Sequence, residues 1–210
     1  MKTDFTRKNK VSGLSSRIMK SVRARGRGAV FTWKDFAVFG KPDAIRQTLA
    51  RLVRRGMLRR VARGIYDWPS TVASLGITVA PDVLAVVQAV ARRDGARIQP
   101  DGARAANQLG LSTQVPARDS FRSTGHAHRI AVGNRVIDVR TGSARLMAAA
   151  GGGAGALVIA ALGYLGRRDI DADDIARLQR ILAPDDKAAL RRAAPVTYRW
   201  MRPILLKIAA

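Results

Sequence analysis

The stretch that decides the fold is "LRRVARGIYDW", Leu58–Trp68. Apolar residues stand on both sides of a short turn at 62–64, a pattern that predicts a two-stranded hairpin. The apolar positions are Leu58, Val61, Ile65 and Trp68. Three cations, Arg59, Arg60 and Arg63, stand close to the turn and repel one another. We interpret this crowding as tolerable because a polyanion is the expected neighbour of the hairpin.

A helix precedes the hairpin, from about Pro42 to Arg55. Pro42 suits a first helical turn, and Gly56 suits the end of a helix. Ile45, Leu49, Leu52 and Val53 recur at helical spacing and predict a buried stripe. The opposite face carries Arg46, Gln47, Ala50, Arg51 and Arg54.

Further upstream, the sequence predicts a helix over residues 14–25, a short strand at "AVF" and a second helix that ends at Gly40. Thr32 can cap this second helix, and the charge of Asp35 favours its N-terminus. The helix is expected to contribute three aromatic side chains to the core, those of Trp33, Phe36 and Phe39. The order of helix, strand, two helices and hairpin is that of a winged helix-turn-helix. We therefore predict such a DNA-binding domain over residues 11–68.

Charge points to the same end of the chain. The protein has 38 Lys and Arg against 15 Asp and Glu, a formal net charge of +23. Residues 1–66 hold 18 basic and 3 acidic residues, so about two-thirds of the excess lies in the first third of the chain. A high-GC genome explains abundant arginine, but not this concentration. Such a field attracts nucleic acid.

The predicted contacts with double-stranded DNA lie on the third helix and the hairpin. Arg46 and Gln47 stand where base edges are reached, because Arg can pair with guanine and Gln with adenine. Lys41 and Asp43 lie at the leading end of the helix. Arg51, Arg54 and Arg55 are predicted to contact phosphates, and the hairpin arginines, Arg59, Arg60 and Arg63, a flanking backbone or the minor groove.

The rest of the chain predicts a linker at 69–82 and a second domain over 83–210. This domain is expected to be mostly helical α+β with a small antiparallel sheet, so the fold class is α+β. Helices are predicted at 83–93 and 101–111, and strands between Val115 and Arg140, with Gly133-Asn134 as a hairpin loop. Helices return after Thr141, with breaks at 151–155, Gly166 and Pro184.

Several short motifs suggest chemistry and are better explained by structure. "GGGAGA" (151–156) resembles a dinucleotide fingerprint, but a helical segment precedes it where a strand is required. The "DIDADD" cluster (169–174) favours a helix N-terminus over a metal site. His126 and His128 have no third ligand nearby, and Asp138 has no following Glu-x-Lys pair of a nuclease. We expect no catalysis, no cofactor and no metal.

The amino-acid composition and the apolar segments exclude further kinds of site and of protein. There is no cysteine, which removes disulfides and thiolate metal sites. "MKTDFTRKNK" is not followed by an apolar segment of a secretory signal, and the apolar run at 156–162 is too short to span a bilayer. We expect a cytoplasmic protein with no membrane association.

Three stretches carry a family resemblance that covers nearly the whole chain. They are "RGAVFTWKDF…AIRQTLARLVRRGMLRRVARGIYDWP", "RIQPDGARAANQLGLSTQVPAR" and "ALVIAALGYLG". They resemble the AbiEi-type antitoxins of type IV toxin–antitoxin systems, in particular their short DUF6088-like branch. Gly64 and Tyr66 fall at the family's wing motif. Leu109, Gly110, Leu111 and Pro116 match its second-domain motif.

The resemblance implies a bacterial protein whose winged helix binds its own promoter and whose C-terminal domain carries antitoxin activity. It also implies a nucleotidyltransferase-like toxin as partner, neutralised without a stable complex. We expect a transcriptional repressor of its own operon. One alternative is a protein-interaction antitoxin or scaffold whose winged helix packs on a protein partner. For the second domain, two roles stay open: contact with the DNA backbone, or dimerisation on repeated half-sites.

Overall fold

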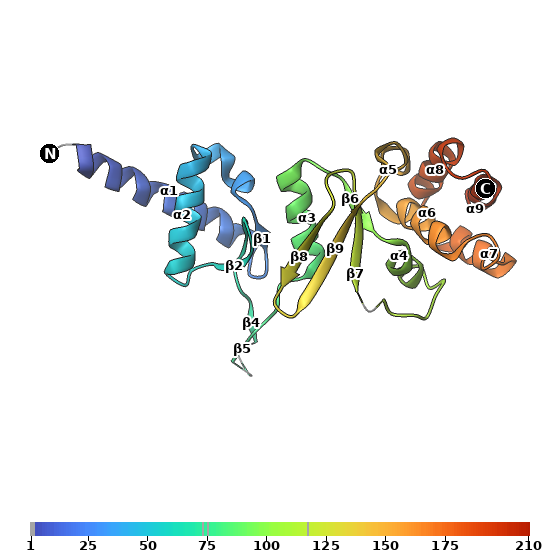
Figure 1. The fold of residues 1–210 in the computed structure, drawn as a ribbon, viewed down its shortest axis with the longest axis horizontal. Helices are drawn as coiled ribbons and strands as arrows, with labels where there is room; N and C mark the ends of the chain where they lie inside the picture. Colours follow the sequence, from blue (N-terminus) through green and yellow to red (C-terminus); the bar gives the residue numbers. More distant parts are fainter. Residues whose placement is uncertain (1–2, 73, 75, 117) are drawn as a thin grey trace. The chain divides into compact units, whose positions relative to one another are not determined.

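The computed structural model describes residues 3–72, 74, 76–116 and 118–210, and the fold class is α+β, as predicted. The chain divides into two compact units (Figure 1). The first comprises Met1–Gly95 and Ala131–Arg135, and the second comprises Ala96–Ile130 and Val136–Ala210.

Up to Asp67 the first unit follows the predicted order of elements, although its first helix begins at Thr3 rather than at residue 14. The elements of this unit are α1 (Thr3–Arg25), β1 (Val30–Phe31), η1 (Trp33–Phe39), α2 (Pro42–Arg54), β2 (Arg59–Ala62), β3 (Ile65–Asp67), β4 (Thr71–Val72), β5 (Ile77–Thr78) and α3 (Val83–Asp94). The η1 segment is a 3-10 helix. Side chains three residues apart line up in that helix, so it places Trp33, Phe36 and Phe39 on one side.

The core of the first unit lies between α1, η1, α2 and the small sheet β1-β3-β2. Three residues of the stripe predicted on α2 are buried, with Ile45, Leu49 and Leu52 at most 1% exposed, whereas Val53 is half-buried. Phe36 is fully buried, and its ring centroid lies 5.6 Å from that of Phe31. The remaining buried members are Leu14, Ile18, Met19, Val22, Leu58 and Tyr66.

The boundary between the units differs from the predicted domains. The segment 69–82 holds the antiparallel pair β4–β5, so it is not a plain linker. Helix α3, assigned to the second domain from its sequence, belongs to the first unit and contacts β1, β3 and η1. The first unit therefore ends at Gly95, which takes a left-handed conformation at the C-terminus of α3. Apolar periodicity predicted the helix correctly but says nothing about which core it joins.

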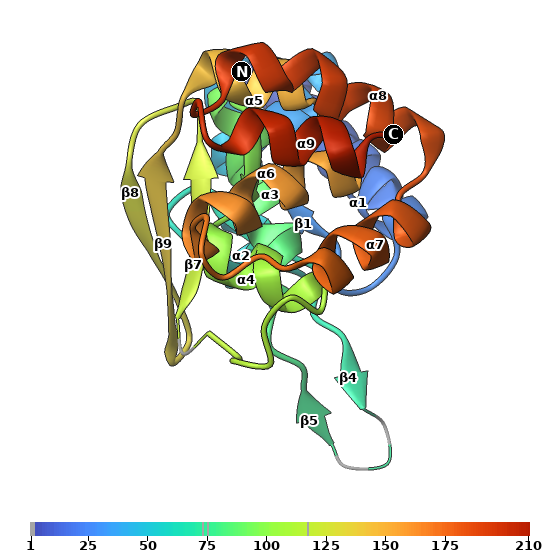
Figure 2. The same ribbon diagram turned by 90° about the vertical axis from the view of Figure 1, so that its right-hand side faces the viewer.

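The second unit continues with one sheet and a group of helices. Its elements are β6 (Ile98–Pro100), α4 (Gly102–Gln108), β7 (Asp119–Ser123), β8 (His128–Val132), β9 (Arg135–Thr141), α5 (Ala144–Ala150), α6 (Gly153–Leu165), α7 (Ala172–Ile181), α8 (Pro184–Ala193), η2 (Ala194–Val196) and α9 (Met201–Ile208). The end of the β8–β9 hairpin, residues 131–135, is grouped with the first unit. Helices α4 and α6 lie on one side of β7 and β9 (Figure 2).

The sheet of the second unit corrects one prediction. Its strand order is β6-β7-β9-β8, and β7 pairs with β9 in parallel. The predicted hairpin of β8 and β9 turns at Gly133-Asn134, with φ +57° at Gly133. After this turn, β9 lies between β7 and β8 and runs in the direction of β7. The sheet is therefore mixed rather than antiparallel, because the partner of β7 is not its neighbour in the sequence.

Structural roles account for the motifs set aside above. Helix α5 precedes "GGGAGA", and α6 begins at Gly153. Asp171 caps α7, and its Oδ1 accepts a hydrogen bond of 2.8 Å from the Asp174 N–H. Asp138 accepts a 2.7 Å bond from Arg129. Across the described ranges, no helix combines the length and apolar character needed to cross a bilayer.

Candidate nucleic-acid interface

The outer face of α2 is polar and open within its unit. Ile45, Thr48, Leu49 and Leu52 are buried, so the opposite side of the helix points away from the core. Exposed positions on this face, at the helix and its two caps, are Lys41, Asp43, Arg46, Gln47, Ala50, Arg54 and Arg55. Six of the ten residues proposed from the sequence are in this group. A helix with such a face has the dimensions to enter the major groove of DNA.

Arg46 is held in place by two neighbours. Its Nη1 donates a 2.9 Å hydrogen bond to Oδ1 of Asp43, one turn earlier on α2. Its guanidinium also lies over the ring of Trp33, with the carbon 4.7 Å from the ring centroid. The Arg46 side chain is nevertheless 51% exposed, so the group is oriented without being covered.

Arg51 turns toward its own helix. Its Nη2 donates a 3.2 Å hydrogen bond to the hydroxyl of Thr48, and its Nε donates a 3.4 Å bond to the carbonyl of Gln47. The residue is half-buried, unlike Arg54 and Arg55. Arg51 therefore has intramolecular partners that compete with a phosphate.

The β2–β3 hairpin turns at Arg63 and Gly64, between the end of β2 and the start of β3. Gly64 has φ +73°, which a residue with a Cβ rarely adopts, and this explains the glycine in the turn. The side chains of Arg60 and Arg63 are exposed. The Arg63 carbonyl accepts a 3.4 Å bond from Nη1 of Arg93 on α3, which ties the turn to that helix.

Within the described part of the fold, Arg59 differs from Arg60 and Arg63 in having an acidic partner. It lies at the far end of the hairpin from the turn, opposite Asp67 in the strand register. Its Nε donates a 3.0 Å bond to Asp67, whose side chain is only 1% exposed, and its Nη2 reaches the carbonyl of Val79 at 3.0 Å. A buried carboxylate requires a counter-charge, so Arg59 serves the fold of the hairpin.

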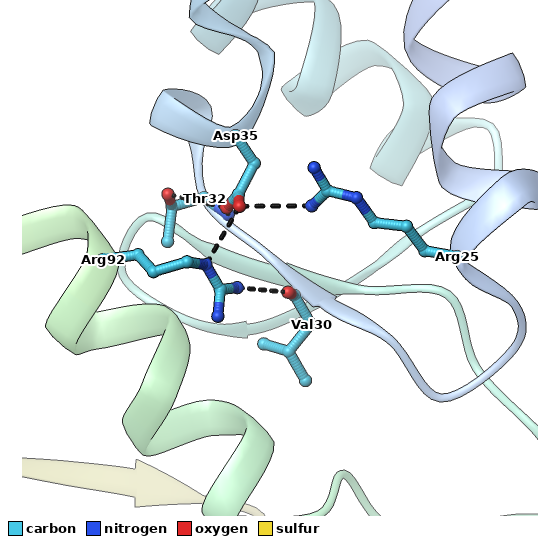
Figure 3. Close-up of polar contacts among 5 residues, drawn as sticks. All are labelled: Arg25, Val30, Thr32, Asp35 and Arg92. Carbon is cyan, nitrogen blue, oxygen red and sulfur yellow. Dashed lines mark hydrogen bonds and ion pairs between the residues drawn. The ribbon is translucent and has the colours of Figure 1, made fainter. Parts of the chain in front are cut away.

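A second cluster of charged side chains joins α3 to η1 (Figure 3). Asp35, 6% exposed, accepts bonds of 3.1 Å from Arg25 and 3.0 Å from Arg92. Its other oxygen accepts a 2.7 Å bond from the Thr32 N–H, and Arg92 also donates to the Val30 carbonyl at 3.0 Å. The cluster fixes α1, β1, η1 and α3 to one another.

The pKa of Asp35 reflects these contacts. Burial on its own raises the pKa of this carboxyl, but the Thr32 N–H and the guanidinium groups of Arg92 and Arg25 outweigh burial. The pKa of Asp35 therefore lies below its ordinary value. The carboxylate stays ionised and keeps both arginines in place.

Sequence reasoning missed Trp33, Arg92 and Arg93 as neighbours of the candidate site. Trp33 precedes Arg46 by 13 residues, and Arg93 follows Arg63 by 30, so no local period connects them. One signal was available for Arg59: Asp67 stands as a single carboxylate between the apolar residues of β3 and Trp68. A lone acid in a buried strand predicts a nearby cation.

Comparison with known proteins gives a family and a structural likeness. No curated protein matches the chain. A solved structure, the RV2827C protein from Mycobacterium tuberculosis, is 17% identical, with a TM-score of 0.43 over 93% of this chain and 81% of that one. A family model described as "Family of unknown function (DUF6088)" matches residues 17–190. The chain therefore belongs to the DUF6088 family.

Proposed function

We propose that this protein is a non-enzymatic, DNA-binding transcriptional regulator. In this proposal the first unit is a winged helix-turn-helix, α2 is its recognition helix and the β2–β3 hairpin is its wing. The observation that carries the proposal is the outer face of α2, where five residues that can bond to bases or phosphates are exposed. These residues are Lys41, Arg46, Gln47, Arg54 and Arg55.

Charge and architecture support the assignment together. The protein carries a formal net charge of +23, and the residues up to 66 supply 18 of its 38 basic residues. The wing contributes Arg60 and Arg63, whose side chains are exposed near the turn. Arg59 already neutralises the buried Asp67, so the proposal does not depend on it. Binding to phosphates releases counterions, so salt should weaken the complex strongly.

The proposed target is the promoter of the protein's own operon, as the resemblance to AbiEi-type antitoxins suggests. A gel shift compares the region upstream of the gene with a scrambled duplex of equal length and composition. We expect tighter binding to the upstream region. Equal affinity for both duplexes would reduce the proposal to non-specific binding.

The antitoxin role is a further part of the proposal and has its own test. The partner would be a nucleotidyltransferase-like toxin encoded beside the gene. Expression of the adjacent reading frame should arrest growth, and co-expression of this chain should relieve the arrest. A harmless neighbouring product would leave a DNA-binding regulator without an antitoxin function.

A protein-binding role is the second candidate, and a surface feature favours it. Apolar side chains are exposed in and beside the β4–β5 hairpin: Val72 by 41%, Ile77 by 58% and Val79 by 42%. Co-purification with the neighbouring gene product, with no DNA retained, would support this candidate over DNA binding.

A further inference from the structure

The arginines on the outer face of α2 differ in their electrostatic setting. Arg46 is paired with Asp43, so the two side chains together carry no net charge. Within the described part of the chain, no acidic side chain pairs with Arg54 or Arg55 at the other end of the helix. A phosphate is attracted by net positive charge, which Arg54 and Arg55 offer and the neutralised pair does not.

The pair is suited to a neutral partner with directed acceptors. Asp43 accepts a hydrogen bond from Nη1 of Arg46. Across the described residues, Nη2 and Nε of that guanidinium donate no hydrogen bond. Two N–H donors on one edge match O6 and N7 of guanine in the major groove. The Asp43 carboxylate, 85% exposed, would also repel a phosphate that approached Arg46.

Trp33 supplies the second restraint on the same group. The guanidinium carbon lies 4.7 Å from the Trp33 ring centroid, at a distance where the ring face attracts a cation. An arginine side chain ordinarily loses much rotamer freedom when it binds. Because Asp43 and Trp33 restrict Arg46 beforehand, less freedom remains to be lost when it meets a base.

We propose that Asp43 and Trp33 are positioning residues that direct Arg46 at a guanine in the operator. The proposal rests on the DNA-binding function of α2 and adds the base that this helix reads. Arg46 provides the contact with guanine, and Asp43 prevents Arg46 from serving as a phosphate clamp. Arg54 and Arg55 contact phosphates.

The test begins with selection of bound sequences from a randomised pool of duplex DNA by the full-length wild-type chain. Binding to the selected duplex and to its three single-base variants at each position is then measured by fluorescence anisotropy. The protein variants are Asp43→Asn, Asp43→Glu and Arg46→Lys, with Arg54→Ala as the matched control. Thermal unfolding of each variant reports on its fold.

We expect the wild type to prefer guanine at one position by about 5- to 150-fold, the discrimination of one bidentate contact. Arg46→Lys and Asp43→Asn should both lose most of this preference at the same position. Asp43→Asn should also bind unrelated duplexes more tightly, because a negative charge is removed. Asp43→Glu should restore part of the preference, since its carboxylate still reaches Arg46. Arg54→Ala should weaken binding to all sequences alike.

Two results would overturn the inference. If Asp43→Asn keeps the wild-type preference, Asp43 does not position Arg46. If it weakens binding to every sequence equally, its role is structural. A wild type that enriches no sequence from the pool would instead contradict the proposed function, and this inference with it. Asp43 is largely exposed, so its substitution tests the idea even if variants of the partly buried Trp33 fail to fold.

Discussion

Individual arginines of this protein have different roles that their sequence neighbours do not reveal. Arg59 and Arg60 are adjacent in β2, yet Arg59 neutralises a buried aspartate while Arg60 is exposed. The difference follows from the alternation of side chains along a strand and from the hairpin register, which places Arg59 opposite Asp67. Formal charge therefore overstates the number of cations that are available to DNA.

Substitution of Arg59 should affect folding more than DNA binding. Arg59→Ala leaves the Asp67 carboxylate buried without its partner, and we expect a loss of about 2 kcal/mol in unfolding free energy, because the Arg59 side chain is 31% exposed. Urea unfolding measures this loss. The matched control, Arg60→Ala, removes the same charge and should be nearly neutral. Equal losses in the two variants would refute the role assigned to Arg59.

The stability of the fold should depend on pH through Asp35 and Asp101. At Asp101, burial raises the pKa, but hydrogen bonds from the Gly102 N–H, Ser120 and Arg122 outweigh it, so this pKa is also lowered. The unfolded chain therefore binds more protons in the window below about pH 4, where unfolded carboxyls titrate. Stability is fully present above this window and is lost as the pH falls through it.

Urea unfolding between pH 3 and pH 6 measures this dependence. Asp35→Asn should be less stable than the wild type at pH 6, and its stability should fall less steeply below pH 4. Asp43→Asn, at an exposed carboxylate, is the control and should keep the wild-type slope. An unchanged slope in Asp35→Asn would remove Asp35 from the acid response.

At the scale of elements, the sequence predicts what depends on local pattern. The stripe of α2, the Thr32–Asp35 start of η1 and the Gly133-Asn134 turn each follow from residues a few positions apart. The parallel pairing of β7 with β9 and the docking of α3 on the first unit depend on contacts between distant segments. The same limit applies to the candidate site: the exposed face of α2 was predictable, and the contact of Trp33 with Arg46 was not.

Close packing of α4 on α6 gives a prediction at this scale. A Cβ at Gly102 would lie 2.3 Å from the Tyr164 Cβ and 2.6 Å from the Ala160 carbonyl oxygen. Because the backbone of α6 must move, Gly102→Ala should cost about 1–3 kcal/mol. Gly163→Ala, on α6 itself, meets its nearest atom at 3.9 Å. This control should be neutral or stabilising by up to about 1 kcal/mol, since alanine favours helices. Thermal unfolding compares the two, and equal destabilisation would contradict the packing described here.

At the scale of the whole molecule, the charge is distributed in a way that suits the proposed function. The first unit carries α2, the β2–β3 hairpin and most of the basic excess, while Asp171, Asp173, Asp174, Asp185 and Asp186 stand at the starts of α7 and α8 in the second unit. Among the described residues, each unit has a hydrophobic core cluster of its own. The family is described as one of unknown function. Support for the proposal therefore comes from the charge of this chain and from the exposed face of α2.

The salt dependence of DNA binding tests the central claim most directly. The measurement compares the wild type with a triple variant, Arg54→Ala, Arg60→Ala and Arg63→Ala, over a range of salt concentrations on one duplex. A control variant has the same charge removed from exposed positions of the second unit, at Arg167, Arg168 and Arg192. We predict that the slope of log affinity against log salt falls by about 0.9 for each phosphate that the first variant no longer neutralises, and by less in the control. An unchanged slope in the first variant, or an equal change in both, would contradict the claim that α2 and the hairpin form the DNA-binding surface.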